Sequence, residues 1–179
     1  MKTSILIAAI SSISLFSLTA NAASTGTITF NGELTSSTCD VVVDGQTADA
    51  TVTLPTVSNT MLAAAGDTAG QTGFNISLEN CTGTIATAKA FFEAGPTVDL
   101  STGRLTNNGL ATNVSLQILD GSNGAAPIEV GNASQVANTT GVDASSGAAD
   151  LPYMVQYYAE GATGAGTVES SVTYTIHYQ

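Results

Sequence analysis

The amino-acid sequence predicts an all-β protein built as a sandwich of two packed sheets, and two observations support this. About eight short segments alternate apolar and polar residues, and clusters of Gly, Pro, Asn and Asp separate them. Residues 60–66 are the only patch of good helix formers, long enough for one or two turns. No linker or internal repeat divides the chain, so one domain is expected after a targeting segment.

That targeting segment is a predicted secretory signal peptide, residues 1–22. Lys2 gives a positive start, an apolar run covers residues 5–18, and residues 20–22 (ANA) fit an A-x-A cleavage site. A transmembrane anchor is disfavoured because the apolar run is too short to cross a bilayer. A soluble, exported product that begins at Ala23 is therefore expected.

Acidic residues greatly outnumber basic ones, and the formal charge of the 179 residues is −11. Loss of residues 1–22 removes Lys2 and changes this charge to −12, so that Lys89 and Arg104 are the remaining cations. Such a chain has no basic patch to neutralise phosphates or anionic lipids. We expect no nucleic-acid partner.

Cys39 and Cys81 are predicted to form a disulfide, because an exported chain folds in an oxidising compartment. Closing a loop of about 42 residues contributes about 4 kcal/mol in the chain-entropy account. A redox-active or metal-binding pair is disfavoured, since the C-x-x-C spacing and a nearby histidine are both absent.

The internal strands are expected to follow one another with short turns. In residues 73–81 the apolar positions are Phe74, Ile76 and Leu78, so this strand is expected at the centre of the core. Residues 50–54 alternate only weakly, residues 101–109 are a polar connection, and residues 132–149 are predicted as a loop. The other internal strands are expected at residues 39–43, 88–94, 113–120, 126–130 and 151–160.

The first strand, residues 24–34, has one entirely polar face and one face of graded size that contains Ile28, Phe30 and Leu34. Two interpretations remain open. It is the first strand of the sandwich, or it is an arm that inserts elsewhere.

The last strand, residues 172–179, places Val172, Tyr174, Ile176 and Tyr178 on one face. The sequence ends on it, and no turn or partner strand follows. Because an apolar strand must bury one face and pair its backbone, either an earlier strand covers it or another molecule supplies the partner.

No residues suited to catalysis or metal binding stand out. His177 is the single histidine, it falls on the polar face of the last strand, and no Gly-x-Ser-x-Gly elbow accompanies it. Residues 120–124 (DGSNG) lack the alternating ligands and the closing glutamate of a calcium loop. We expect no enzyme, no metal and no cofactor.

Taken in order, these segments resemble the pilin subunits of chaperone–usher fimbriae, most closely the major subunits of type 1 fimbriae. The resemblance covers nearly the whole chain after residue 22. It rests on residues 26–32 (GTITFNG), Cys39, residues 73–78 (GFNISL), Cys81, residues 113–120 (NVSLQILD), residues 151–159 (LPYMVQYYA), Gly166 and residues 174–179 (YTIHYQ).

The resemblance implies an incomplete immunoglobulin-like sandwich that lacks its last strand, formed by residues 37–179. Residues 23–36 would be an N-terminal donor-strand extension that inserts into the next subunit. Its pocket-facing residues would be Ser24, Gly26, Ile28, Phe30 and Gly32. The acceptor groove and chaperone-binding edge would be formed by Val172, Tyr174, Ile176 and Tyr178.

The function implied is that of a structural subunit of a cell-surface fimbria, which polymerises head to tail by donor-strand exchange and supports adhesion. The partners implied are neighbouring pilin subunits, a periplasmic chaperone and an outer-membrane usher, with export through the periplasm. The alternatives are a minor adaptor or tip-associated subunit, or a single-domain adhesin for glycans. The absence of Trp disfavours the adhesin, since Trp is the best platform for stacking sugars.

Overall fold

A computed structural model describes residues 26–32 and 38–179, and the predicted signal peptide lies outside these residues. The chain forms two compact units, Met1–Leu34 and Thr35–Gln179. In the first unit, residues 26–32 have no regular secondary structure, and the side chains of Ile28 and Phe30 are 78% and 89% exposed. The strand expected at residues 24–34 is thus not formed in its described part. A strand needs a hydrogen-bonded neighbour, and no described residue pairs with this segment.

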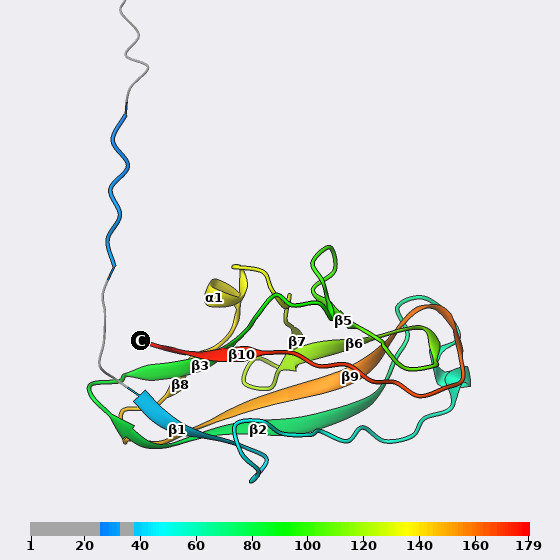
Figure 1. Cartoon of the computed structure of the whole chain (residues 1–179), viewed down its shortest axis with the longest axis horizontal. Coiled ribbons are helices and arrows are strands. Elements are labelled where there is room, and N and C mark those ends of the chain that lie inside the picture. The colour runs from blue at the N-terminus through cyan, green and yellow to red at the C-terminus, as the bar shows by residue number, and fades with distance from the viewer. Residues whose placement is uncertain (1–25, 33–37) are drawn as a thin grey trace, which may run out of the picture. The chain divides into compact units, whose positions relative to one another are not determined.

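The second unit is a sandwich of two antiparallel sheets, which confirms the predicted fold class (Figure 1). The larger sheet has the strand order β1-β2-β9-β6-β5-β4, with β7 paired to β6, and the smaller sheet has the order β10-β3-β8. The strands are β1 (Thr38–Val43), β2 (Thr68–Thr82), β3 (Thr87–Phe92), β4 (Val98–Asp99), β5 (Arg104–Thr106), β6 (Thr112–Asp120), β7 (Ala126–Pro127), β8 (Val142–Asp143), β9 (Ala149–Gly164) and β10 (Tyr174–Tyr178). Two short helices, η1 (Asn59–Leu62) and α1 (Gln135–Asn138), complete it.

The core lies between the two sheets and is formed by the alternating apolar positions of the long strands. Ile76 and Leu78 of β2 are each 1% exposed, as predicted from their spacing. From the smaller sheet, the ring of Phe92 meets Tyr153 of β9 edge to face, with centroids 5.0 Å apart. A register shift by one residue would move these apolar side chains out of the core, so their burial fixes the register of the central strands.

A disulfide ties β1 to β2. Cys39 and Cys81 are bonded, which confirms the predicted pairing. At its other end β1 stops in a tight turn, where Asp44 and Gly45 have φ of 48° and 71° and the Gln46 N–H donates to the Val43 carbonyl at 2.9 Å. Positive φ at both central residues is typical of a type I′ turn, as expected for Asp-Gly.

Two expectations about connecting segments were wrong. The polar connection at residues 101–109 contains β5, and the predicted loop at residues 132–149 contains α1 and β8. Strands of two or three residues are too short to show a period, and tertiary pairing alone defines them. The predicted edge strand at residues 126–130 is reduced to β7.

Candidate functional site

A groove of about 810 Å³ runs along one side of β10. Its floor is made of core side chains from the inner face of the larger sheet: Phe74 and Ile76 of β2, Leu105 of β5, Leu116 and Ile118 of β6, and Val155 of β9. Residues 169–176 form one wall. Along this side no further strand of the described residues covers the apolar core of the sandwich.

Three of the four residues predicted for the groove line it. Val172, which directly precedes β10, and Tyr174 and Ile176 within β10 all contribute to its wall. Tyr178 does not line the groove. Its hydroxyl oxygen accepts a hydrogen bond from the Cys39 N–H at 3.3 Å, so this side chain connects β10 to the start of β1.

The backbone of β10 is paired on one edge only. Gln179 and Thr87 exchange two hydrogen bonds of 2.8 Å, and the register then places Thr175 opposite Phe91. Because bonded and non-bonded pairs alternate in an antiparallel ladder, Tyr174 and Ile176 direct their N–H and C=O groups toward the groove. Among the described strands, β10 pairs with β3 alone.

The opposite wall was not predicted from the sequence. It consists of Val41 and Val43 of β1, residues 48–52 and Leu54. The Tyr174 hydroxyl donates to the Ala48 carbonyl at 2.9 Å, so this side chain spans from β10 to that wall. Burial and the charge of Asp49 raise the pKa of Tyr174 above its ordinary value. The strand predicted at residues 39–43 supplies Val41 and Val43, and the weak alternation of residues 50–54 was the only sequence signal for the rest of this wall.

Ser170 adds an unsatisfied polar group beside the groove. Its hydroxyl oxygen is buried and is the one such side-chain atom without a hydrogen-bond partner in residues 26–32 and 38–179. Buried polar atoms are normally paired, and this hydroxyl is free to bond with a group that enters the groove.

The other edge of the smaller sheet is closed. β8 pairs with the first two residues of β3, and the Ala90 N–H donates to the Tyr153 hydroxyl at 2.8 Å. The side chain of Gln135 then takes the place of a strand, since its Oε1 accepts from the Phe92 N–H at 3.1 Å and its Nε2 donates to the Phe92 carbonyl at 2.9 Å. Side chains of the chain itself therefore bond the Ala90 N–H and both backbone groups of Phe92 at this edge.

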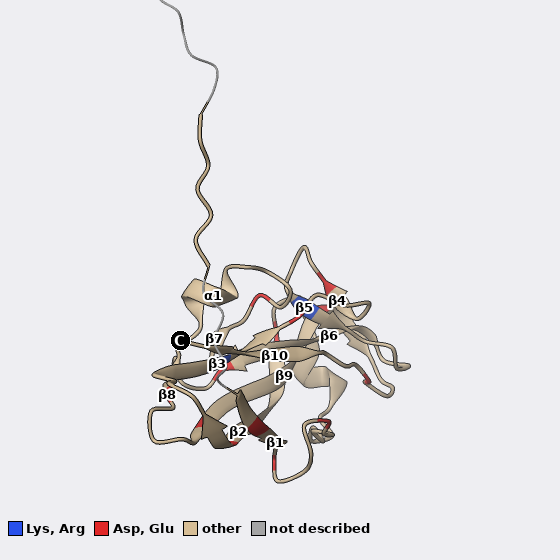
Figure 2. Ribbon diagram, turned by 60° about the vertical axis from the view of Figure 1, so that its left-hand side comes forward, with Lys and Arg blue, Asp and Glu red and all other residues tan. Residues whose placement is uncertain are grey.

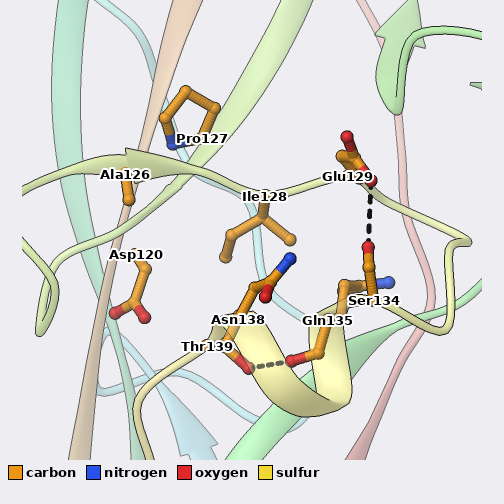
Figure 3. Close-up of a pocket in the computed structure, with 9 residues that line it drawn as sticks. All are labelled: Asp120, Ala126, Pro127, Ile128, Glu129, Ser134, Gln135, Asn138 and Thr139. Atoms are coloured by element: carbon orange, nitrogen blue, oxygen red, sulfur yellow. Dashed lines mark hydrogen bonds between the residues drawn. The ribbon is translucent and has the colours of Figure 1, made fainter.

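Helix α1, which carries Gln135, is held in place by its surroundings. The ammonium group of Lys89, a side chain only 6% exposed, donates to the carbonyl oxygens of Val136 and Thr139 near the end of the helix. A small pocket of about 80 Å³ remains between α1 and the β7 segment (Figure 3). One of its acidic groups, Glu129, already accepts a hydrogen bond from the Ser134 hydroxyl at 2.9 Å.

Charged residues are few and scattered along the described chain (Figure 2). The Arg104 guanidinium pairs with Glu160 at 2.9 Å and lies 4.0 Å from the centroid of the Tyr158 ring. Burial favours a higher pKa for Glu160, but hydrogen bonds from Arg104 and Ser115 outweigh it and lower that pKa. Both cations of the described residues are therefore engaged within the fold.

His177 is half-buried and was predicted to face solvent. Its ring stacks on Phe91 of the neighbouring strand, with centroids 5.1 Å apart. Within residues 26–32 and 38–179, no group of three His, Cys, Asp or Glu residues is placed to hold a metal ion. No helix in the described residues is long and apolar enough to span a membrane.

The fold is that of the immunoglobulin-like pilins. The crystal structure of the P pilus rod subunit PapA aligns with a TM-score of 0.54 at 20% sequence identity, covering 86% of this chain and 100% of that chain. At that identity the similarity concerns the fold.

Sequence comparisons identify the family. The family described as Type-1 fimbrial protein, A, matches residues 54–179. Major fimbrial subunit SMF-1 of Stenotrophomonas maltophilia (strain K279a) is 47% identical over 170 residues, which cover 90% of this chain and 96% of that protein. F17 fimbrial protein of Escherichia coli is 39% identical over 160 residues, 86% of this chain and 87% of that protein. The chain belongs to the type 1 fimbrial protein family.

Membership of this family defines the general role. Its members are structural subunits of fimbriae, which assemble with other pilin subunits into a filament on the cell surface. The resemblance inferred from the sequence is confirmed.

Proposed function

We propose that this chain polymerises head to tail by donor-strand exchange, with the arm at residues 23–36 of one copy filling the groove of the next. The observation that carries the proposal is the pairing of an open apolar groove, bordered by the free edge of β10, with two exposed apolar side chains, Ile28 and Phe30. A strand added to an exposed sheet edge gains affinity from backbone hydrogen bonds and specificity from its alternating side chains. Pilins are a recognised case of this mode.

The arm is suited to such an edge. Ile28 and Phe30 would each contribute roughly 1.5–3 kcal/mol on full burial. Ser24, Gly26 and Gly32 occupy the remaining positions of the same face, where small side chains fit narrow parts of the groove. The arriving backbone would also supply hydrogen-bond partners for β10, and the unpaired Ser170 hydroxyl lies in the same wall.

Before polymerisation, the groove needs another occupant. In the proposed route the signal peptide, residues 1–22, directs export, and a periplasmic chaperone lends a strand to the edge formed by Val172, Tyr174, Ile176 and Tyr178. An outer-membrane usher then exchanges that strand for the arm of the next subunit. The protein acts as a building block of the fimbria and catalyses no reaction.

Binding of the isolated arm tests this proposal. A synthetic peptide of residues 24–34 should bind the purified monomeric chain in a 1:1 ratio, measured by calorimetry. The same peptide with Ile28→Asp and Phe30→Asp is the matched control and should not bind, because two charges would enter an apolar groove.

The arm can also be removed in cells. Deletion of residues 23–32 should leave a subunit that folds but forms no fimbriae visible by electron microscopy. Filaments of normal number and length from the deleted chain would show that the arm is dispensable.

A further inference from the structure

Two large apolar side chains are exposed at one end of the sandwich. Leu110, in the connection between β5 and β6, is 80% exposed, and Met61 of η1 is 58% exposed. Their chain neighbours Ala111 and Leu62 pack into one small apolar cluster, so both exposed side chains belong to the same end of the molecule. Figure 1 shows η1 at this end, beside the loop that connects β9 to β10.

This end is also one mouth of the groove. The Asn108 N–H donates to the Glu169 carbonyl at 2.8 Å, and the Leu110 N–H donates to the Thr167 hydroxyl at 3.1 Å. Glu169 begins the groove wall that continues into β10. The connection that carries Leu110 therefore borders the groove where β10 begins, far along the strand from Tyr178.

We propose that Met61 and Leu110 form a seat for the folded body of the subunit whose arm fills the groove. This inference rests on the proposed function and adds a second contact between neighbouring copies. The occupant is a second copy of this chain, which presents the end of its sandwich where β1 begins.

The position of that body follows from the need for an open assembly. Each copy's own arm joins its sandwich at Thr38, next to Cys39 and its bond with Tyr178. If the donor body also sat at that end, two copies could exchange arms reciprocally and close as a dimer. Fimbriae require contacts that do not close, so the donor body belongs at the opposite mouth. The arm then runs antiparallel to β10.

Chain length keeps the donor body close to this mouth. Only six residue steps separate Gly32, the last pocket-facing residue of the arm, from Thr38, where the sandwich begins. Fully extended, six steps span at most about 22 Å. The donor body is therefore held within about 22 Å of the rim. Contact with the rim would cover the exposed leucine and methionine side chains.

The test uses fimbriae assembled from the full chain with Leu110→Ser, with Met61→Ser, and with Leu100→Ser as the matched control. Leu100 is 65% exposed, but it lies in the turn between β4 and β5, against Gly131. Dissociation of sheared filaments in denaturant should be about tenfold faster for Leu110→Ser than for Leu100→Ser, since covered apolar area is lost. Met61→Ser should change the rate in the same direction.

Binding of the arm peptide separates this contact from the groove. The peptide of residues 24–34 has no attached body, so its affinity for the Leu110→Ser monomer should equal that for the unsubstituted chain. Equal dissociation rates for the Leu110 and Leu100 variants would overturn the proposal, as would weakened peptide binding by Leu110→Ser. Failure of the unsubstituted chain to bind the peptide would instead contradict arm insertion itself, and this contact with it.

Discussion

At the residue scale, the Tyr153 hydroxyl is a buried polar group that joins the two sheets across the core. Tyr153 is 3% exposed, and its oxygen accepts a hydrogen bond from the Ala90 N–H in the smaller sheet at 2.8 Å. Burial, together with the charge of Asp120, raises the pKa of Tyr153 to about 12, against the opposing effect of the Ala90 N–H.

This raised pKa predicts a loss of stability in alkali. The unfolded chain releases the Tyr153 proton near pH 10, and the folded chain releases it at about pH 12. The contribution of Tyr153 to the free energy of unfolding is therefore complete below pH 10 and is lost as the pH rises toward 12. In Tyr153→Phe, the fall in unfolding free energy across this window should be shallower by about 1.4 kcal/mol per pH unit. Urea titrations at several pH values measure both slopes, and equal slopes for the two chains would refute the assignment.

Gly166 illustrates a requirement for the absence of a side chain. A Cβ at this position would lie 2.4 Å from the Ala111 nitrogen and 2.5 Å from the Leu110 carbonyl carbon. Both atoms belong to the backbone and cannot rotate away, so Gly166→Ala should reduce the unfolding free energy by about 1–3 kcal/mol. Gly95→Ala is the control, because no atom lies within 4 Å of its added carbon. The urea midpoint should fall for Gly166→Ala and stay near the original for Gly95→Ala.

At the scale of the element, β10 has two different edges, and Tyr178 lies at the end of the free one. Tyr178→Phe keeps the aromatic ring but loses the hydrogen bond from the Cys39 N–H. Its free energy of unfolding should fall by about 1 kcal/mol. Tyr178→Asp introduces a charge at the proposed chaperone-binding edge and should abolish capture by the chaperone. Co-purification of the periplasmic chaperone with each variant is the measurement. Undiminished recovery with Tyr178→Asp would mean that the chaperone binds elsewhere.

The sequence predicted the long elements well, because their burial pattern is periodic. The apolar positions of β2 and β6 are spaced by two, and every one of Ile76, Leu116 and Ile118 lies in the core. The sequence did not predict features that depend on contacts between residues far apart in the chain. Gln135 reads as an ordinary polar residue in a loop, and only the approach of Phe92 makes its side chain a substitute for a strand.

The candidate site could be predicted in part for the same reason. Val172, Tyr174 and Ile176 form an alternating stretch at the end of the sequence, and all three line the groove. The opposite wall at residues 48–52 contains no regular strand and few large side chains, so no local pattern revealed it. The rim residues Leu110 and Met61 lie in connections, where an exposed apolar residue has no distinctive spacing.

At the scale of the whole molecule, the disulfide ties one groove wall to the core. Cys39 belongs to β1, whose Val41 and Val43 line the groove, and Cys81 ends the central part of β2. Replacing both cysteines with alanine should lower the unfolding free energy by about 4 kcal/mol, because the unfolded chain regains the freedom of a closed loop of about 42 residues. Urea unfolding with and without reductant measures this loss. The unsubstituted chain should be sensitive to reductant and the double variant should not.

The closed outer edge of β3 has a consequence for the chemistry of assembly. With Gln135 and β8 occupying that edge, the smaller sheet keeps one unpaired edge. In the proposed arm exchange, the subunit would be, in polymer terms, a bifunctional monomer with two unlike ends, and growth would yield unbranched chains of uniform polarity. In the proposed route each incoming copy donates its arm to the groove of the copy before it. A copy that lacks its arm would therefore serve only as the first subunit of a filament and could not be added to a growing one.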